Sequence, residues 1–322
     1  MKAYVVGDMG AAIADAPKPS PTGSQILVKV HACGLNRADI GISKGHAHGA
    51  IGGAGTIVGM EWAGEVVEVG PAATQAKVGD RVMGSGGGAF AEFAITDHAR
   101  TFPVPGSMSY ETAATLPIAL ATMHDAVVTN GALQTGQSAL IQGASSGVGL
   151  MALQIAKHKG AKLVIGSSTN AERRGRLKEF GADLAIDSKD SGWVDQVLKA
   201  TDGKGVDLIV DQVSGPTANG NLAATKVKGR IVNVGRLGGS HGDFNFDLHA
   251  ARRINYIGVT FRTRTIEEIR DIFARVRADI WPAVESGKLK LPIDKVYPFA
   301  EIGAAFARME ANQHLGKIVV TL

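Results

Sequence analysis

The fold is decided by the stretch Gln137-Ser138-Ala139-Leu140-Ile141-Gln142-Gly143-Ala144-Ser145-Ser146-Gly147-Val148-Gly149-Leu150-Met151-Ala152-Leu153-Gln154-Ile155-Ala156. Its apolar run breaks at small residues and resumes at helical spacing, which predicts a strand, a tight turn and a helix. Free N–H groups and the helix dipole favour negative charge at such a helix start, and glycine lets a pyrophosphate approach the backbone. The stretch therefore indicates a dinucleotide-binding βαβ unit, with Ser146, Gly147 and Val148 as cofactor contacts.

The glycine fingerprint of this turn is incomplete. The usual pattern has glycine at three positions, whereas this chain has Ala144 and Ser146 at the first two and Gly149 at the third. A small-residue turn at the start of an ordinary helix is the alternative interpretation. The next strand provides the evidence that favours a cofactor.

The strand expected at Lys162–Gly166 ends in hydroxyl side chains and is followed by Arg173 and Arg174. A site that prefers NAD needs an acid near this strand end to bond the ribose 2′-hydroxyl, and none stands there. Hydroxyls with a guanidinium nearby suit a 2′-phosphate, because arginine offers a fork of donors that matches phosphate oxygens. The sequence therefore predicts NADPH, bound by Ser168 and Arg173. A solvated helix face is the alternative for the two arginines.

Composition limits the class of protein. The 322 residues are enough for two domains, and 45% hydrophobic with 20% charged residues is typical of a globular protein. The net charge of +4 is scattered, so nucleic acid is not an expected partner. Cys33 is the only cysteine, which excludes an intrachain disulfide. Met1–Val6 is predicted to be a strand and not a signal peptide, and no apolar run is long enough for a membrane span. We expect a cytoplasmic protein.

The first part of the chain, to about Thr101, predicts a compact β-rich domain. Strands are expected at Gln25–Ala32, Gly64–Gly70 and Ala89–Ile95, with a glycine loop at Gly84–Gly88. The alanine-rich segment Ser109–Val128 predicts a helix that leads into the dinucleotide-binding turn.

The second part of the chain alternates strands and helices, which predicts a parallel, doubly wound sheet. The expected strands are Ala182–Asp187, Val206–Asp211, Arg230–Gly235 and Ile254–Thr260, and the expected helices lie near Trp193–Ala200 and Thr217–Val227. A long helix is expected at Ile266–Trp281, ending before Pro282, and a shorter one at Glu301–Asn312. The closing strand Lys317–Thr321 is expected to return to the first domain.

Short motifs along nearly the whole chain resemble the medium-chain dehydrogenase/reductase superfamily, and within it the zinc-free, zeta-crystallin-like quinone oxidoreductase branch. The resemblance rests on the order and spacing of Gly34–Asp39, Gly59–Gly64, Val78–Val82, Leu116–Ala119, Ala144–Gly149, Met309–Asn312 and Gly316–Val319. It implies an α/β protein with a doubly wound parallel Rossmann sheet over 123–260 and a β-rich, GroES-like catalytic domain from 1–122 and 261–322. It also implies a homodimer.

The resemblance further predicts that no metal is bound. Zinc-dependent relatives place ligands where this chain has Asn36, Met60 and Ile118, and an amide, a thioether and an alkyl chain cannot replace thiolate and imidazole. The four cysteines of a structural zinc lobe are also absent. His46 and His48 lie in a glycine-rich loop without thiolates, where exposed polar residues are more common than ligands.

Without zinc, the substrate oxygen needs hydrogen-bond donors where negative charge develops. Asn36 is the best candidate, directly or through the cofactor's ribose, with Asp39 orienting it. For Asp39 the alternative is local bonding between its side chain and the backbone.

The resemblance implies further cofactor contacts from both domains. Thr122 and the loop Gly235-Arg236-Leu237 would face the nicotinamide, and Ser188 stands where relatives carry an aromatic residue near the adenine. Residues expected to close over the cofactor or to bind it from the other domain are Phe261, Arg262, Asn312 and Lys317. Arg236, Arg262 and Lys317 have surface charge as their alternative.

These features together predict an NADPH-dependent reductase that passes hydride to a small-molecule quinone. Two alternatives stay open: reduction of an enone or enoyl double bond with the same cofactor, and a nucleotide-binding protein with little catalytic activity.

Overall fold

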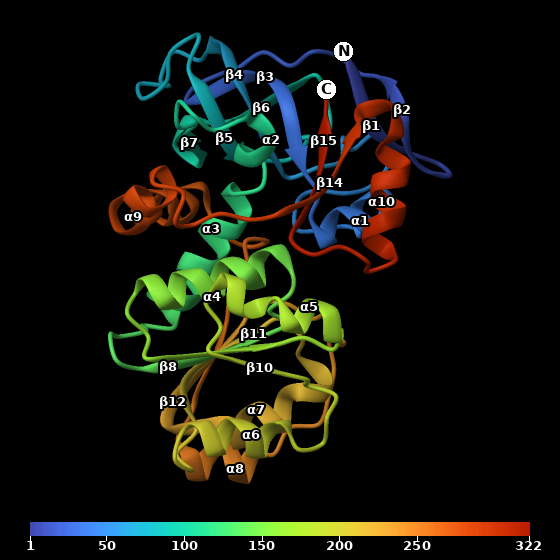
Figure 1. The fold of residues 1–322 in the computed structure, drawn as a ribbon. Helices are drawn as coiled ribbons and strands as arrows, with labels where there is room; N and C mark the ends of the chain where they lie inside the picture. Colours follow the sequence, from blue (N-terminus) through green and yellow to red (C-terminus); the bar gives the residue numbers. More distant parts are fainter. The chain divides into compact units, whose positions relative to one another are not determined.

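A computed structural model describes all residues, 1–322. The chain divides into two compact units, one made of 1–121 with 261–322 and the other of 122–260. The first and last parts of the chain thus form one unit, and each unit has its own sheet (Figure 1). No helix is long and apolar enough to cross a bilayer.

The first unit is built on a seven-stranded sheet. Its strands run in the order β14-β15-β3-β4-β5-β7, and β6 also pairs with β3. The C-terminal strand β15 is antiparallel to β3, so the chain's end returns to this unit as expected. The bounds are β3 Gln25–Gly34, β4 Glu61–Val69, β5 Arg81–Ser85, β6 Phe93–Asp97, β7 Thr101–Pro103, β14 Ile293–Pro298 and β15 Lys317–Thr321. A separate hairpin pairs β1 (Lys2–Gly7) with β2 (Gly10–Asp15).

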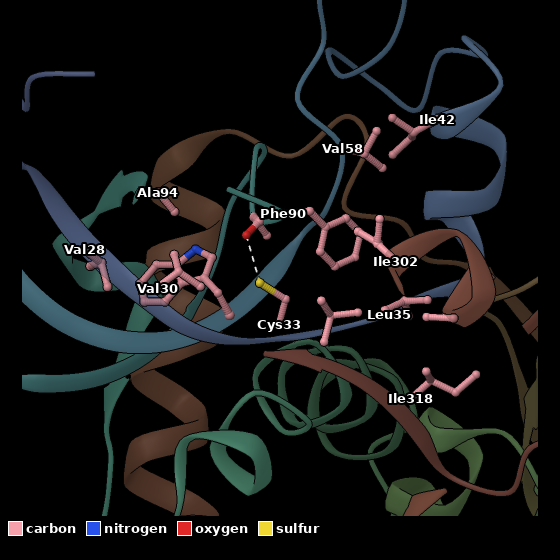
Figure 2. Packing of buried hydrophobic residues seen from close by; sticks show 14 of the residues in the cluster. Val28, Val30, Cys33, Leu35, Ile42, Val58, Phe90, Ala94, Ile302 and Ile318 are labelled. Atoms are coloured by element: carbon pink, nitrogen blue, oxygen red, sulfur yellow. Dashed lines mark hydrogen bonds between the residues drawn. The ribbon is translucent and has the colours of Figure 1, made fainter. Parts of the chain in front are cut away.

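The apolar sides of these strands enclose the core of the first unit. Figure 2 shows its centre, where Phe90, Leu35 and Ile318 pack around the fully buried Cys33. The Cys33 thiol donates to the Ala89 carbonyl at 2.9 Å. Helices α1 (Arg37–Ser43) and α10 (Ile302–Glu310) belong to the same unit.

The second unit is a six-stranded parallel sheet in the order β10-β9-β8-β11-β12-β13. All five residues of β8 are buried, as expected for a strand covered by helices on both faces. In Figure 1, α4 lies on one face of the sheet and α6 and α7 on the other. The strands are β8 Ser138–Gln142, β9 Leu163–Ser167, β10 Leu184–Ile186, β11 Val206–Asp211, β12 Thr225–Asn233 and β13 Asn255–Gly258. The helices are α4 Gly147–His158, α5 Ala171–Gly175, α6 Trp193–Ala200, α7 Ala218–Ala224 and α8 Phe246–Arg252.

Two helix expectations were wrong. The expected helix at Ser109–Val128 is divided into α2 (Tyr110–Ala113), α3 (Pro117–His124) and a π-helical turn at Asp125–Asn130, because Pro117 lacks the N–H that a continuous helix needs. Helix α9 (Ile266–Glu285) continues past Pro282. Buried Ala283 and Val284 extend its apolar side, and the Pro282 carbonyl accepts a bond from the Ser286 N–H, so packing outweighs the lost donor.

The other differences lie at element ends. Gly84 and Ser85 belong to β5 and not to the glycine loop, and the following strand β6 begins only at Phe93. Strand β12 already begins at Thr225, where a helix was expected to continue to Val227. The pairing of β12 with β11 is irregular at this point, and Lys228 has a φ of 63°.

Candidate active site

The turn between β8 and α4 has the geometry that a dinucleotide needs. Gly143 has a φ of 72°, in the region that favours glycine. Ser146 is the N-cap of α4: its hydroxyl accepts from the Gly149 N–H at 3.1 Å and lies 3.0 Å from Gln212 Oε1. A Cβ on Gly149 would come within 2.6 Å of the Gly143 carbonyl oxygen and 2.7 Å of the Ala144 Cα. The third glycine is therefore required for the close approach of helix and strand.

Hydroxyl groups meet at the carboxyl ends of β8 and β9. The hydroxyls of Ser145 and Ser168 are 3.0 Å apart. The Ser168 carbonyl accepts from the Arg174 guanidinium at 2.9 Å, and the same nitrogen lies 3.0 Å from Asp187 Oδ2. Arg174 thus lies beside Ser168, and its guanidinium neutralises the neighbouring Asp187 carboxylate. The sequence did not reveal this role of Arg174.

Arg173 lies half-buried on the short helix α5, whose N-cap Asn170 accepts from the Arg173 backbone N–H at 2.9 Å. Ser188, the residue after Asp187, is also half-buried. Arg173, Ser168 and Ser188 thus come from the region around the ends of β9 and β10 in the second unit.

The loop Gly235-Arg236-Leu237 follows β12 and is held by the end of β11. Its backbone N–H groups bond to the carbonyls of Asp211 and Gln212, at 3.2 Å from Gly235 and 3.0 Å from Leu237. Ser214, with a φ of 59°, donates its hydroxyl to the Gly235 carbonyl at 2.7 Å. The side chains of Arg236 and Leu237 are exposed, so the loop offers a fixed backbone with accessible side chains.

In the first unit, Asn36, Glu61 and Lys317 form a buried polar cluster. The Lys317 ammonium donates to Glu61 Oε1 and, at 3.0 Å, to Asn36 Oδ1. The Asn36 amide donates to Glu61 Oε1 at 2.9 Å and to the Gly34 carbonyl at 3.3 Å. Lys317 is 5% exposed and Glu61 is 0% exposed, so the surface alternative for Lys317 was wrong.

Both N–H groups of the Asn36 amide are engaged in this cluster, whereas the ammonium of Lys317 has three N–H donors, two of them used. The arrangement therefore favours Lys317 over Asn36 as the group with a donor to spare.

Asp39 contacts the Asn36 backbone and not its amide. Asp39 Oδ2 accepts from the Asn36 N–H at 2.8 Å, which is the local alternative that the sequence left open. Its other oxygen, Oδ1, is buried without a hydrogen-bond partner. Burial raises the pKa of Asp39 to about 7, although the Asn36 N–H and the Lys317 charge oppose this shift.

Glu61 also contacts the backbone of Ile118, which stands at the third position where zinc-dependent relatives carry a ligand. Its Oε2 accepts from the Ile118 backbone N–H at 3.0 Å, and Met60 is its neighbour in the chain. The Lys317 ammonium donates to Asn36, which stands at another of the positions that would have to carry a metal ligand. The structure has no group of three or more His, Cys, Asp or Glu side chains that could hold a metal ion, and an amide, a thioether and an alkyl chain do not fit zinc.

The remaining expected residues are distributed over both units. Thr122 lies half-buried on α3 in the second unit. In the first unit, Asn312 has a φ of 54° and its side-chain oxygen accepts from Arg37 at 2.5 Å. Phe261 lies under the Arg264 guanidinium at 5.7 Å, and Arg262 is exposed.

Sequence reasoning gave no role to Glu61. The signal was present, because an acid inside the apolar run Gly59-Met60-Glu61-Trp62-Ala63 is expensive to bury without a partner. The partner is Lys317, which is 256 residues away in the chain and lies on a strand of the same sheet.

Family models match both units. The model "alcohol dehydrogenase GroES-like domain" matches residues 22–106, and "zinc-binding dehydrogenase" matches residues 147–277. The chain belongs to the medium-chain dehydrogenase/reductase superfamily. It is an oxidoreductase of this superfamily, with the parallel Rossmann-like sheet and the GroES-like domain of its members.

Relatives within the superfamily differ in length and chemistry. The quinone oxidoreductase of Rattus norvegicus is 29% identical over 96% of this chain and 92% of its own length. The mycocerosic acid synthase-like polyketide synthase of Mycolicibacterium smegmatis is 30% identical over 94% of this chain, which spans only 14% of that much longer protein.

Solved structures show the same architecture along the whole chain. A mycobacterial protein in complex with NADPH superposes with a TM-score of 0.89 at 27% identity, covering 100% of both chains. The CurK enoyl reductase superposes with a TM-score of 0.87 at 27% identity, covering 99% of this chain and 98% of its own.

Proposed function

We propose that this superfamily member is an NADPH-dependent quinone reductase that works without zinc. The observation that carries the proposal is the buried Lys317–Glu61–Asn36 cluster, which supplies a fixed ammonium donor, paired with a carboxylate, where zinc-dependent relatives have metal ligands. Similarity to rat quinone oxidoreductase and to a structure solved with NADPH supports the substrate class and the cofactor.

NADPH would be held by the second unit. The β8–α4 turn with Ser146, Gly147 and Val148 would take the pyrophosphate, and Gly235-Arg236-Leu237 with Thr122 the nicotinamide end. Ser168 and Arg173 would bind the 2′-phosphate, while Arg174 holds the Ser168 carbonyl and neutralises Asp187, so that no free carboxylate repels the phosphate. When bound, the cofactor supplies the hydride.

In the first unit, Lys317 would place its remaining N–H donor toward the oxygen on which negative charge develops. Glu61 and Asn36 fix the direction of the ammonium, and Asp39 fixes the Asn36 backbone. We therefore assign Lys317 the polarising role that the sequence suggested for Asn36, and Asn36 and Asp39 positioning roles.

The test is NADPH oxidation measured with a quinone, with an enone and without acceptor, together with metal analysis after dialysis. We expect quinone-dependent turnover that a strong chelator does not reduce. Stoichiometric zinc with chelator-sensitive activity would overturn the zinc-independent part, and NADPH binding without turnover of either acceptor would favour a weakly catalytic nucleotide-binding protein.

Reduction of an enone or enoyl double bond is the second candidate. It is favoured by the similarity to the CurK enoyl reductase over nearly the full length of both chains. The same donor on Lys317 would serve an enone carbonyl. Faster turnover of the enone than of the quinone in the same assay would favour this candidate.

We also infer a homodimer formed through β13 of the second unit. This strand ends the parallel sheet, so one side of its backbone is unpaired. Phe246 is 76% exposed, and the Phe244 ring makes edge-to-face contacts with the rings of Phe246 and Tyr256. Light scattering on Tyr256→Glu should show a monomer, with Val78→Glu in the first unit as control. A cytoplasmic location, which suits the buried thiol of Cys33, can be checked by cell fractionation.

A further inference from the structure

A pocket lies in the first unit, and none of its lining residues belongs to the Lys317 cluster. It has a volume of about 570 Å³ and is bordered by α9, by the turn His98–Arg100 and by the loop after β4. Its lining residues include no Asp or Glu; those that concern its chemistry are Ser24, Thr74, Gln75, His98, Arg270 and Arg277.

Helix α9 presents two arginines to this pocket from one face. Arg270, Ala274 and Arg277 follow one another at spacings of four and three residues, so they lie in one row along the helix. Ala274 between them is exposed and small, which leaves the space between the two guanidinium groups open.

Positive charge exceeds negative charge around the pocket. Arg270 binds the Asp97 carboxylate through two nitrogens, at 3.1 Å and 2.5 Å, and the charge of Glu267 on α9 also acts on Arg270. Ser24 and the Ala99 N–H also bond to Asp97, so this carboxylate is already saturated. Its charge also acts on the guanidinium of Arg100, whereas no carboxylate acts on that of Arg277.

Arg277 is the cation without a carboxylate. Its guanidinium lies 5.6 Å from the centre of the Phe102 ring and donates to the Thr101 carbonyl. Burial lowers its pKa, and no acid opposes this shift. Arg100, from the turn that borders the pocket, adds a further buried guanidinium, whose Nε has no hydrogen-bond partner. Charges of this kind are costly to bury unless an anion joins them.

Further polar side chains complete the lining. His98 Nδ1 is buried without a hydrogen-bond partner, and Thr74 and Gln75 contribute a hydroxyl and an amide from the opposite loop. The guanidinium of Arg277 has no carboxylate partner in the protein, and arginine binds phosphate oxygens in pairs.

We propose that this pocket is a binding site for a phosphate group, free or carried by a small organic molecule. Arg277 and Arg270 bind the phosphate oxygens, and His98 with Thr74 and Gln75 completes the site. The pocket is larger than the ion itself, so it has room for the organic part of a phosphate ester.

The experiment is calorimetric titration of the full chain with inorganic phosphate, with a hexose phosphate and with the uncharged hexose. We expect both phosphates to bind and the hexose not to bind. Tighter binding of the hexose phosphate identifies an organic phosphate as the ligand, and equal affinities identify the free ion. The absence of binding by either phosphate at millimolar concentration would overturn the proposal.

Variants of α9 test whether phosphate binds in this pocket. Arg277→Ala should weaken phosphate binding about ten- to a hundredfold, as for the loss of a hydrogen bond to a charged group. Ala274→Glu keeps both arginines and places a carboxylate between them at an exposed helix position, so it should abolish binding without affecting the fold. Arg275→Ala is the matched control, because Arg275 lies on the same helix and pairs with Asp271 at 2.8 Å.

A phosphate bound at the dinucleotide turn would behave differently. It would be weakened by Arg173→Ala and unaffected by Arg277→Ala and Ala274→Glu. That pattern would refute the proposed pocket and leave the cofactor assignment standing.

Discussion

The ammonium of Lys317 donates directly to the carboxylate of Glu61, and both side chains are almost completely excluded from water. Removing one partner leaves a buried charge without compensation. Lys317→Met should therefore lower the free energy of unfolding of the first unit by about 3 to 5 kcal/mol, measured by urea denaturation.

The double variant Lys317→Met with Glu61→Gln removes both charges and should recover most of this loss. Lys2→Met, at the exposed pair with Asp15, is the control and should change stability little. If the single and double variants are equally destabilised, the charge pair is not the cause. Measuring quinone turnover separates a role of Lys317 in stability from a role in the reaction. The double variant should fold and still lack quinone turnover.

Arg173 and Arg174 are expected to differ in cofactor selectivity. Loss of a hydrogen bond to a charged group costs about 1.5 to 3 kcal/mol, so Arg173→Ala should weaken NADPH binding by about one to two orders of magnitude and barely affect NADH. Arg174→Ala should weaken both cofactors to a similar degree, because Arg174 holds the Ser168 carbonyl and Asp187. Fluorescence titration with both cofactors measures this, and an equal loss in Arg173→Ala would show that Arg173 does not contact the 2′-phosphate.

Asp39 should make stability depend on pH. Because burial raises its pKa to about 7, the folded state holds a proton that the unfolded state has released above about pH 4. The free energy of unfolding should therefore fall as pH rises from about 4 to 7, by up to about 1.4 kcal/mol per pH unit.

Asp39→Asn keeps an acceptor for the Asn36 N–H and removes the titration, so its profile over this range should be flatter. The hydrogen bonds from Arg270 and Ser24 lower the pKa of Asp97 to about 2 against the effect of burial. The titration of Asp97 therefore changes the free energy of unfolding only below this pH range. Parallel profiles for wild type and Asp39→Asn would contradict the assignment.

Gly149 should not tolerate a side chain. A Cβ there would meet the backbone at Gly143 and Ala144, which cannot move aside as a flexible side chain can. Gly149→Ala should lower the melting temperature and the affinity for NADPH together. Gly303→Ala on α10 is the control, because nothing lies within 4 Å of its Cβ position, and it should be neutral or slightly stabilising. Unchanged NADPH affinity in Gly149→Ala would show that the turn does not bind the cofactor.

The periodic elements could be predicted from the sequence because their signals are local. Helix α6 and strand β15 have the expected bounds, and β8 with α4 follows from one uninterrupted stretch. The element ends that were wrong depend on partners far along the chain. Pro282 stays inside α9 because the residues after it find apolar neighbours, and the helix before β12 ends at Ala224 because Thr225 already pairs with Val206 of β11.

The features of the candidate site also fall into those that the sequence predicts and those that only the structure reveals. The sequence by itself determined the dinucleotide-binding turn, the alternation that builds the parallel sheet and the absence of thiolate and imidazole at Asn36, Met60 and Ile118, because residue type and spacing carry this information. Only the tertiary structure decided that Glu61 is bound by Lys317, that Arg174 lies beside Ser168 and that Arg277 borders a pocket with no acid in its lining. These contacts join residues on different elements, and the energy of a buried charge depends on which group the fold brings within a few ångströms of it.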